Sequence, residues 1–130
     1  MEGEKLYSSQ ITFLNFKDFE CGKKFMVDCL GLEEIYNVGW AVVYRAAEKA
    51  FLGVVDHSST ELGAKDGVLI SLTTGSAESL HQRVSAYMKG RVSDIKEIPE
   101  AGLKSFFFTG PEGFKFEIEE FLLPEIRELF

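Results

Sequence analysis

Hydrophobic and charged residues alternate strictly near the end of the chain. The segment Phe114–Glu119 reads Phe-Lys-Phe-Glu-Ile-Glu, so a strand there turns three apolar side chains to one face and three charged ones to the other. Before it, Thr109-Gly-Pro-Glu-Gly113 has the Pro and Gly of a tight turn, and a Phe-rich stretch precedes that turn. The pattern predicts a hairpin of strands 103–109 and 114–121, with Glu117 on the face opposite the apolar side chains.

The rest of the chain predicts the same order of elements twice. The first set is a strand at 10–16, a helix at 19–30 capped by Asp18, a short strand or extended link at 32–37, and a hairpin of strands 40–44 and 50–56. After a polar connector at 57–66, the second set is a strand at 68–73, a helix from Ser76 to Gly90, a strand at 92–98 and the hairpin above. We therefore predict an α+β fold.

This fold is one domain, 1–130, of two βαβββ units, about 7–57 and 66–121, with a short helix or clamp in the tail 122–130. Each unit forms a curved mixed sheet with its helix on the outer face, and the two inner faces enclose a cup.

Composition narrows the class of protein. The net charge of -7 argues against nucleic acid as a partner, because a phosphate-binding surface is basic. No apolar run approaches the ~20 residues of a membrane span, and the first residues lack a secretory signal. Cys21 and Cys29 fall in one predicted helix, roughly 12 Å apart, which is too far for a disulfide. These features predict a reduced, cytoplasmic protein without membrane association.

Aromatic residues supply the candidate ligand-binding wall. We expect the cup to be lined by Phe13, Trp40, Tyr44, Phe106 and Phe108, with Asn15 as a polar anchor. Aromatic walls with few polar groups suit a flat, small organic molecule. The alternative, equally weighted, is that these rings only fill the core. His81, among polar residues of the second helix, is expected to face solvent.

Two motifs resemble those of a known superfamily. Asn15-Phe-Lys-Asp18, followed by Phe25 and Cys29-Leu-Gly-Leu32, resembles the opening motif of the vicinal-oxygen-chelate proteins. These are the glyoxalase, bleomycin-resistance and extradiol-dioxygenase proteins. Phe108-Thr-Gly-Pro-Glu-Gly-Phe-Lys-Phe-Glu117 resembles their closing motif, with Gly110 where the family has Asp. The resemblance covers nearly the whole chain and implies paired βαβββ units.

The resemblance also implies one divalent metal, held by side chains from the inner sheet faces. Its four ligand positions fall on Ile11, near Gly53, on Val68 and on Glu117. Only Glu117 is a ligand type, whereas a divalent site needs three or four N or O ligands. We therefore expect no resident metal cofactor. Glu117 is the candidate catalytic residue, as a metal ligand or general base, unless Lys115, Asn15 or water merely satisfies it.

Three functions follow from this pattern. The first is a metal-independent protein that binds a small organic molecule, of the drug-sequestering type. The alternative is a metal-dependent lyase, isomerase or dioxygenase that uses Glu117 in a degenerate site. The third is an interaction module with a filled core. The resemblance further implies a homodimer, for which the apolar tail residues Leu123, Ile126, Leu129 and Phe130 are the candidate interface.

Overall fold

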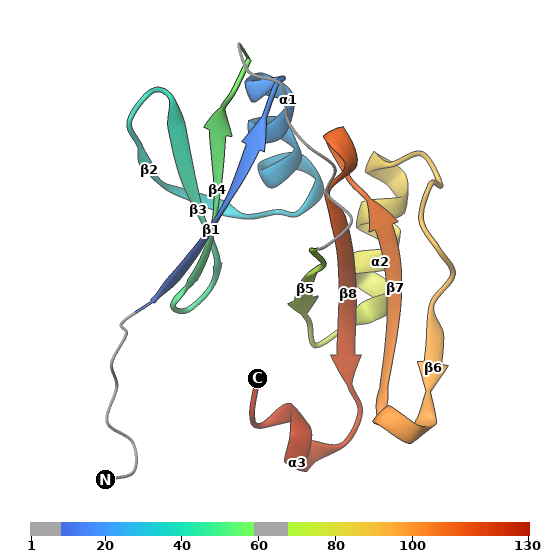
Figure 1. The fold of residues 1–130 in the computed structure, drawn as a ribbon. Coiled ribbons are helices and arrows are strands. Elements are labelled where there is room, and N and C mark those ends of the chain that lie inside the picture. Colours follow the sequence, from blue (N-terminus) through green and yellow to red (C-terminus); the bar gives the residue numbers. More distant parts are fainter. Residues whose placement is uncertain (1–8, 59–67) are drawn as a thin grey trace, which may run out of the picture. The chain divides into compact units, whose positions relative to one another are not determined.

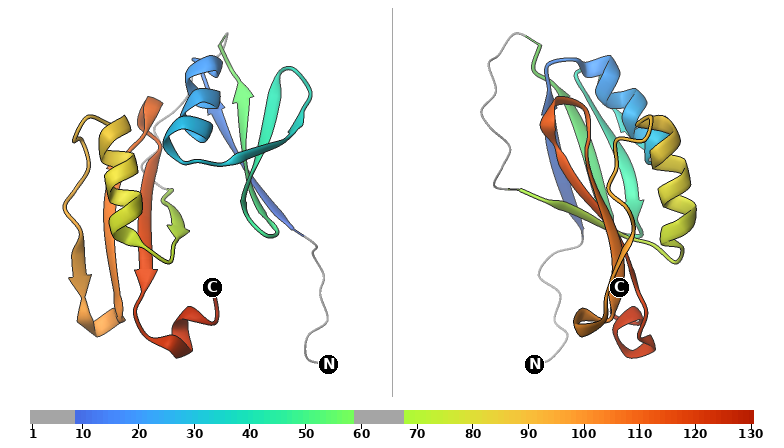
Figure 2. Two further views of the ribbon diagram at one scale, coloured as in Figure 1. Left: turned by 180° about the vertical axis from the view of Figure 1, so that it is seen from behind. Right: turned by 90° about the vertical axis from the view of Figure 1, so that its right-hand side faces the viewer.

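The computed structural model describes residues 9–58 and 68–130, and the chain divides into two compact units, Met1–Leu62 and Gly63–Phe130. Each unit is a four-stranded mixed sheet with a helix on one face (Figures 1 and 2). In both, the order along the chain is one strand, a helix and three strands, which confirms the α+β class and the two βαβββ units. Tyr7 and Asp66, the predicted starts of the units, lie outside the described residues. The cup stays a prediction.

The sheet of the first unit has the strand order β1-β4-β3-β2, in which β1 runs parallel to β4 and the other pairs are antiparallel. Its helical segment begins at Asp18, whose carboxylate accepts a hydrogen bond of 3.0 Å from the backbone N–H of Cys21. The elements are β1 (Gln10–Phe16), α1 (Phe19–Lys24), the π-helical turn η1 (Phe25–Cys29), β2 (Glu33–Asn37), β3 (Ala41–Ala47) and β4 (Ala50–Asp56).

The core of the first unit lies between α1 and one face of its sheet. Alternate residues of β1 are buried there, among them Leu14 and Phe16. Gly22 allows the close approach of α1, because a Cβ at this position would lie 2.8 Å from the Phe16 ring and 2.9 Å from Val54 Cγ1. Cys29 is buried and Cys21 half-buried, and the two do not form a disulfide with each other.

The sheet of the second unit has the equivalent order, β5-β8-β7-β6, with β5 parallel to β8. Ser76 caps its helix as predicted, since Ser76 Oγ accepts from the N–H of Ser79 at 3.2 Å. The elements are β5 (Ile70–Thr73), α2 (Ala77–Tyr87), β6 (Lys96–Ile98), η2 (Pro99–Ala101), β7 (Leu103–Thr109), η3 (Pro111–Gly113), β8 (Lys115–Phe121) and α3 (Pro124–Arg127).

The register of the β7–β8 hairpin decides which side chains face the helix. Thr109 pairs with Lys115 and Phe107 with Glu117. Phe116 and Ile118 are buried on the α2 side, and Lys115, Glu117 and Glu119 share the other face, as the alternation predicts. The ring of Phe108 stacks on that of Phe116, with centroids 5.3 Å apart.

Two expectations for the second unit are wrong. The strand expected at 92–98 begins only at Lys96, because Ser93 bonds to Phe107 outside a regular ladder. His81 does not face solvent freely: it is half-buried, its ring meets Phe106 edge-on at 4.8 Å, and its Nε2 lies 2.9 Å from the carbonyl oxygen of Ser93. The segment after α2 is thus tied back to both the helix and β7.

Candidate functional site

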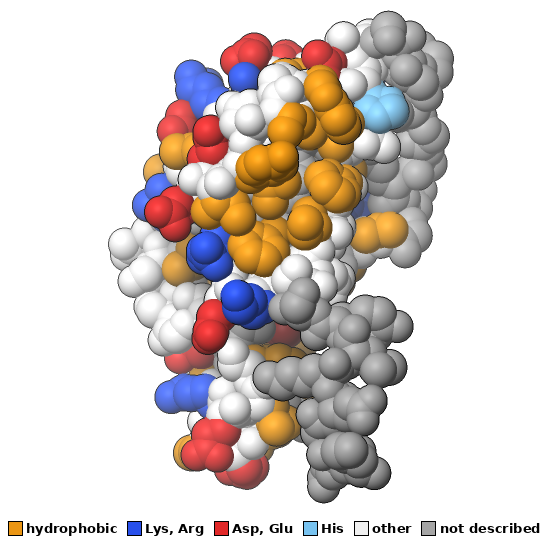
Figure 3. All heavy atoms as spheres, turned by 90° about the vertical axis from the view of Figure 1, so that its left-hand side faces the viewer, with side chains coloured by type: hydrophobic (Ala, Val, Ile, Leu, Met, Phe, Trp, Pro, Cys, Tyr) orange, Lys and Arg blue, Asp and Glu red, His pale blue; other side chains and the backbone are white. Residues whose placement is uncertain are grey.

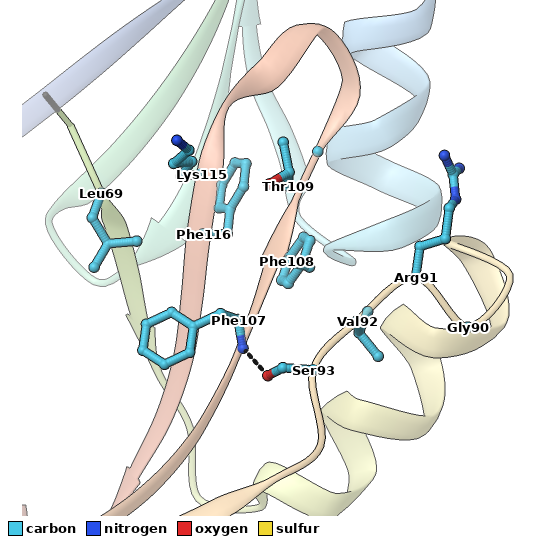
Figure 4. Close-up of a pocket in the computed structure, with 11 residues that line it drawn as sticks. Leu69, Gly90, Arg91, Val92, Ser93, Phe107, Phe108, Thr109, Lys115 and Phe116 are labelled. Atoms are coloured by element: carbon cyan, nitrogen blue, oxygen red, sulfur yellow. Dashed lines mark hydrogen bonds between the residues drawn. The ribbon is translucent and has the colours of Figure 1, made fainter. Parts of the chain in front are cut away.

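A cavity of about 650 Å³ lies in the second unit, between the segment that follows α2 and the hairpin β7–β8 (Figure 4). Its volume is within the roughly 300–1,000 Å³ of pockets that hold small molecules. The lining residues come from three parts of the unit: Leu69 before β5, Gly90, Arg91, Val92 and Ser93 after α2, and Phe107, Phe108, Thr109, Gly110, Lys115 and Phe116 from the hairpin.

The apolar wall of this cavity includes a ring on the open face of the sheet. Phe107 is 45% exposed, although Phe106 and Phe108 on either side of it are buried. Leu69 and Val92 add aliphatic surface, and Leu69 is also largely exposed. Below them lie the stacked rings of Phe108 and Phe116, which belong to the core. The wall is therefore held by a rigid strand, while one large ring stays accessible.

The polar part of the lining carries two cations. Arg91 Nε donates a hydrogen bond of 3.0 Å to the carbonyl oxygen of Met88, the C-terminal cap of α2, which anchors the side chain. Lys115 lines the cavity from β8, beside Thr109 on the neighbouring strand. Ser93 has a structural role, because its Oγ accepts from the N–H of Phe107 at 2.8 Å (Figure 4).

Glu117 lies at mid-strand on the same face as Phe107. Its Oε1 accepts a hydrogen bond of 3.0 Å from the hydroxyl of Ser71, its direct partner on β5. Glu119 lies two residues further on the same face, and burial raises the pKa of its carboxyl. The nearby charge of Glu117 also raises this pKa, against a hydrogen bond from Ser71 that lowers it. Ser71 therefore influences both carboxylates, while its hydroxyl donates to Glu117.

A second hydroxyl, that of Ser105, is buried on this face without a hydrogen-bond partner among the described residues. The residue is 2% exposed and pairs directly with Glu119 across β7 and β8. Two carboxylates and the hydroxyls of Ser71 and Ser105 thus gather on one sheet face. Such a group can hold and move protons, with Glu117 as the oriented acceptor.

The first unit has an open sheet face with accessible aromatic rings. Phe13 is 52% exposed and lies in one cross-strand row with Gly53, Val43 and Tyr36. Asn15 is exposed on the same face, and Trp40, just before β3, is 65% exposed. Figure 3 shows hydrophobic side chains gathered on this side of the unit. Phe13, Asn15 and Trp40 are therefore accessible to a ligand, as their predicted role requires.

The other predicted ligand-binding rings have different positions. Tyr44 and Phe106 point to the helix side of their sheets and are buried, so the alternative that they fill the core describes them. Burial raises the pKa of Tyr44 to about 12, with the charges of Glu34 and Glu20 adding to the effect. Phe108 is buried as well but forms part of the cavity lining.

Sequence reasoning missed Phe107, the exposed ring in the wall of the cavity. The signal was present, because a hairpin centred on Glu112 pairs Phe107 with Glu117 and puts both on one face. Lys115 lies on the charged face of the alternating segment, so its position could be predicted from the sequence in the same way. Arg91 carried no such signal, since its place depends on how the segment after α2 folds back.

The residues at the implied metal-ligand positions do not fit a divalent metal. Ile11 and Val68 carry no ligand atom, and the Phe13 ring fills the space beside Gly53, where a Cβ would lie 2.5 Å from Phe13 Cδ1. Within residues 9–58 and 68–130, no group of three or more His, Cys, Asp or Glu side chains could hold a metal ion. Glu117 alone does not make such a site.

Comparison with known proteins gives a likeness in structure alone. No family model matches the chain. No curated protein matches it by sequence. Among the described residues, no helix has the length and apolar character needed to cross a membrane.

Several solved structures are similar in fold at low sequence identity. A lactoylglutathione lyase from Agrobacterium tumefaciens matches with a TM-score of 0.66 and 19% identity, over 89% of this chain and 96% of that one. A fosfomycin resistance protein from Listeria monocytogenes matches with a TM-score of 0.74 and 16% identity, over 95% of this chain and 99% of that one. A glyoxalase/bleomycin resistance protein/dioxygenase from Nocardioides matches with a TM-score of 0.69 and 16% identity, over 93% of this chain and 87% of that one. The chain therefore shares the fold of these solved structures, and this is the fold that the resemblance of its two motifs to the vicinal-oxygen-chelate proteins predicts.

Proposed function

We propose that this chain binds a small organic molecule in the cavity of its second unit, without a resident metal. The observation that carries the proposal is the cavity itself, of about 650 Å³, with the half-exposed ring of Phe107 in its wall. A core-filling residue would be buried like Phe106. An accessible ring on a rigid strand is instead the usual contact for the apolar body of a ligand.

The fold neighbours support this class of function at a coarse level. They include a fosfomycin resistance protein and glyoxalase/bleomycin resistance proteins, and these names associate the fold with small molecules. Fold alone does not identify a ligand, because one fold hosts many activities. The proposal therefore depends on the cavity and not on these names.

A neutral aromatic probe tests the proposal directly. N-phenyl-1-naphthylamine becomes fluorescent in apolar sites, and we expect saturable binding that Phe107→Ala weakens by roughly tenfold, as expected for loss of a large apolar contact. Tyr36→Ala, which removes an exposed ring from the first unit, is the matched control and should leave the affinity unchanged. Absence of saturable binding would contradict the proposal. Loss of binding in Tyr36→Ala instead would move the site to the first unit.

A second candidate function is catalysis by Glu117. The observation in its favour is the hydrogen bond from Ser71, which orients a mid-strand carboxylate on an accessible face. A metal-dependent lyase, isomerase or dioxygenase would need further metal ligands from outside residues 9–58 and 68–130. Lactoylglutathione turnover, measured with added Ni, Zn, Mn or Fe, tests the lyase form of this candidate. Activity that Glu117→Gln abolishes would favour it, and no activity with any metal would remove it.

We also propose that the protein is a homodimer in the cytoplasm. The tail supports an interface, because Leu129 and Phe130 are 74% and 75% exposed, and the ring of Phe130 is held by stacking on Phe121 at 4.9 Å. Exposed apolar side chains in a group are typical of interaction surfaces. Light scattering after size-exclusion chromatography should give the mass of two chains, and Leu129→Asp together with Phe130→Asp should give the mass of one. A monomer before substitution would refute the dimer.

A further inference from the structure

One wall of the cavity is a short segment between helix and strand. Residues 90–93 line the cavity, after the end of α2 at Tyr87 and before the start of β6 at Lys96. Because such a wall belongs to no helix or ladder, its position depends on a few individual contacts. Contacts on either side of Val92 hold this wall segment in place.

The first anchor of the wall segment is the end of α2. The backbone N–H of Gly90 donates to the carbonyl oxygen of Ser85 at 2.8 Å. Arg91 donates to the carbonyl oxygen of Met88 through its backbone N–H at 3.2 Å and through Nε at 3.0 Å. Lys89 and Gly90 both have positive φ, which reverses the chain after the helix. The segment up to Arg91 therefore keeps its place as long as α2 is folded.

The second anchor is Ser93, which contacts both β7 and α2. Its backbone N–H donates to the carbonyl oxygen of Phe107 at 2.9 Å, and its Oγ accepts from the N–H of the same residue at 2.8 Å (Figure 4). The carbonyl oxygen of Ser93 lies 2.9 Å from Nε2 of His81. Because a carbonyl oxygen only accepts, Nε2 carries the proton of this bond. Ser93 thus joins the wall segment to the strand that carries the exposed ring of Phe107.

His81 supports this anchor from the helix. Its ring meets that of Phe106 edge-on, with the centroids 4.8 Å apart and an angle of 83° between the planes. Phe106 is fully buried, so this contact fixes the direction in which Nε2 points. His81 is itself half-buried and is not one of the residues that line the cavity. Any influence of His81 on a ligand therefore passes through Ser93.

We propose that His81 is a positioning residue of this cavity, which holds the wall segment 90–93 beside Phe107 through its hydrogen bond to Ser93. This inference rests on the proposed function, since it names a residue that shapes the same site. Without the bond, Ser93 loses its link to α2 and the wall segment leaves its place more often. The ligand then finds a formed cavity in fewer molecules, and the apparent affinity falls by that fraction.

Two substitutions at His81 separate the hydrogen bond from the bulk of the side chain. His81→Gln keeps an amide N–H donor, whereas His81→Leu fills the space and removes the donor. We expect His81→Leu to weaken the binding of N-phenyl-1-naphthylamine by roughly three- to tenfold, as for the loss of one hydrogen bond, and His81→Gln to restore most of the affinity. Gln82→Leu, at the next and exposed position of α2, is the matched control and should bind like the parent protein.

Hydrogen exchange of backbone amides tests the anchor without any ligand. In His81→Leu, the N–H groups of Ser93 and Phe107 should exchange at least about threefold faster than in the parent protein, because both donate within the anchor. The N–H of Met88, which donates to Val84 at the end of α2, should keep its protection and so report an intact helix. His81→Gln should exchange like the parent protein at all three amides.

The two measurements distinguish failure of this inference from failure of the proposed function. If the parent protein and His81→Leu bind the probe equally well, the positioning role is wrong, while the cavity still binds small molecules. If His81→Gln loses as much affinity as His81→Leu, or if Met88 also loses protection, His81 supports the fold in general and the inference is again wrong. If the parent protein does not bind the probe, the proposed function fails, and the role of His81 at a ligand site fails with it.

Discussion

The ring of Phe13 lies over the backbone of Gly53, its direct partner on β4. A Cβ at residue 53 would lie 2.5 Å from Phe13 Cδ1, well inside contact distance. The glycine thus lets an aromatic ring lie flat across the open face of the first sheet. This contact also takes the space that a metal-ligating side chain would need at that position.

We predict that Gly53→Ala displaces the Phe13 ring while the unit stays folded. Because Phe13 is 52% exposed, its ring can swing toward solvent, and the cost in unfolding free energy should be at most about 1 kcal/mol. Urea unfolding measures the cost, and the aromatic proton shifts of Phe13 in NMR spectra report the displacement. An unchanged Phe13 environment would contradict this account.

Gly22→Ala should behave differently, because its neighbours are buried. The new methyl group would lie 2.8 Å from the Phe16 ring and 2.9 Å from Val54 Cγ1, and neither side chain has room to move. Overpacking of this kind costs about 1–3 kcal/mol. That cost exceeds the gain of up to about 1 kcal/mol from replacing Gly in a helix. A urea-unfolding midpoint equal to or above that of the parent protein would show that α1 packs less closely than described.

Much of the fold could be predicted from local patterns. Strand β1 was predicted with its observed bounds, because β-branched and aromatic residues extend up to the Asp18 cap. The bounds of β7 also agree, since Gly110 and Pro111 end it. The strand before β7 was misplaced because hydrogen bonds to His81 and Phe107, invisible in the sequence, hold Ser93 outside the ladder.

The candidate site was harder to predict than the fold. A run of three Phe residues has no internal alternation, so its inward and outward positions depend on the hairpin register. Phe106 and Phe108 were chosen for the cup, whereas the exposed ring is Phe107. Arg91 reaches the cavity only through the reversal of the chain after α2, where Lys89 and Gly90 both have positive φ. No periodic pattern marks such a reversal.

Ser105→Ala should stabilise the protein. The hydroxyl of Ser105 is buried and, among the described residues, has no hydrogen-bond partner, so it loses hydration on folding without compensation. Its removal should raise the unfolding free energy by about 1 kcal/mol. Ser93→Ala is the contrasting variant, because it deletes the acceptor of the Phe107 N–H and should destabilise. An equal loss of unfolding free energy in both variants would imply that the Ser105 hydroxyl has a hydrogen-bond partner.

The raised pKa of Glu119 predicts a pH dependence of stability. Burial, together with the charge of Glu117, makes the folded state bind the Glu119 proton more tightly than the unfolded state does. The stabilisation that the bound Glu119 proton gives is complete below the pKa of Glu119 in the unfolded chain. It is lost as the pH rises through the pKa of Glu119 in the folded protein. Glu119→Gln should remove this loss and be more stable than the parent protein at neutral pH, by urea unfolding across pH 3–8. Glu100→Gln, an exposed control, should follow the parent protein.

The central claim is that the chain binds a small organic molecule without a metal. Its most direct test is the affinity for N-phenyl-1-naphthylamine of protein stripped with EDTA, compared with protein given Ni, Zn, Mn or Fe, in the parent chain and in Glu117→Ala. We predict one dissociation constant throughout, because Glu117 is not among the residues that line the cavity. Binding that requires a metal and disappears in Glu117→Ala would contradict the claim and favour the metal-dependent enzyme.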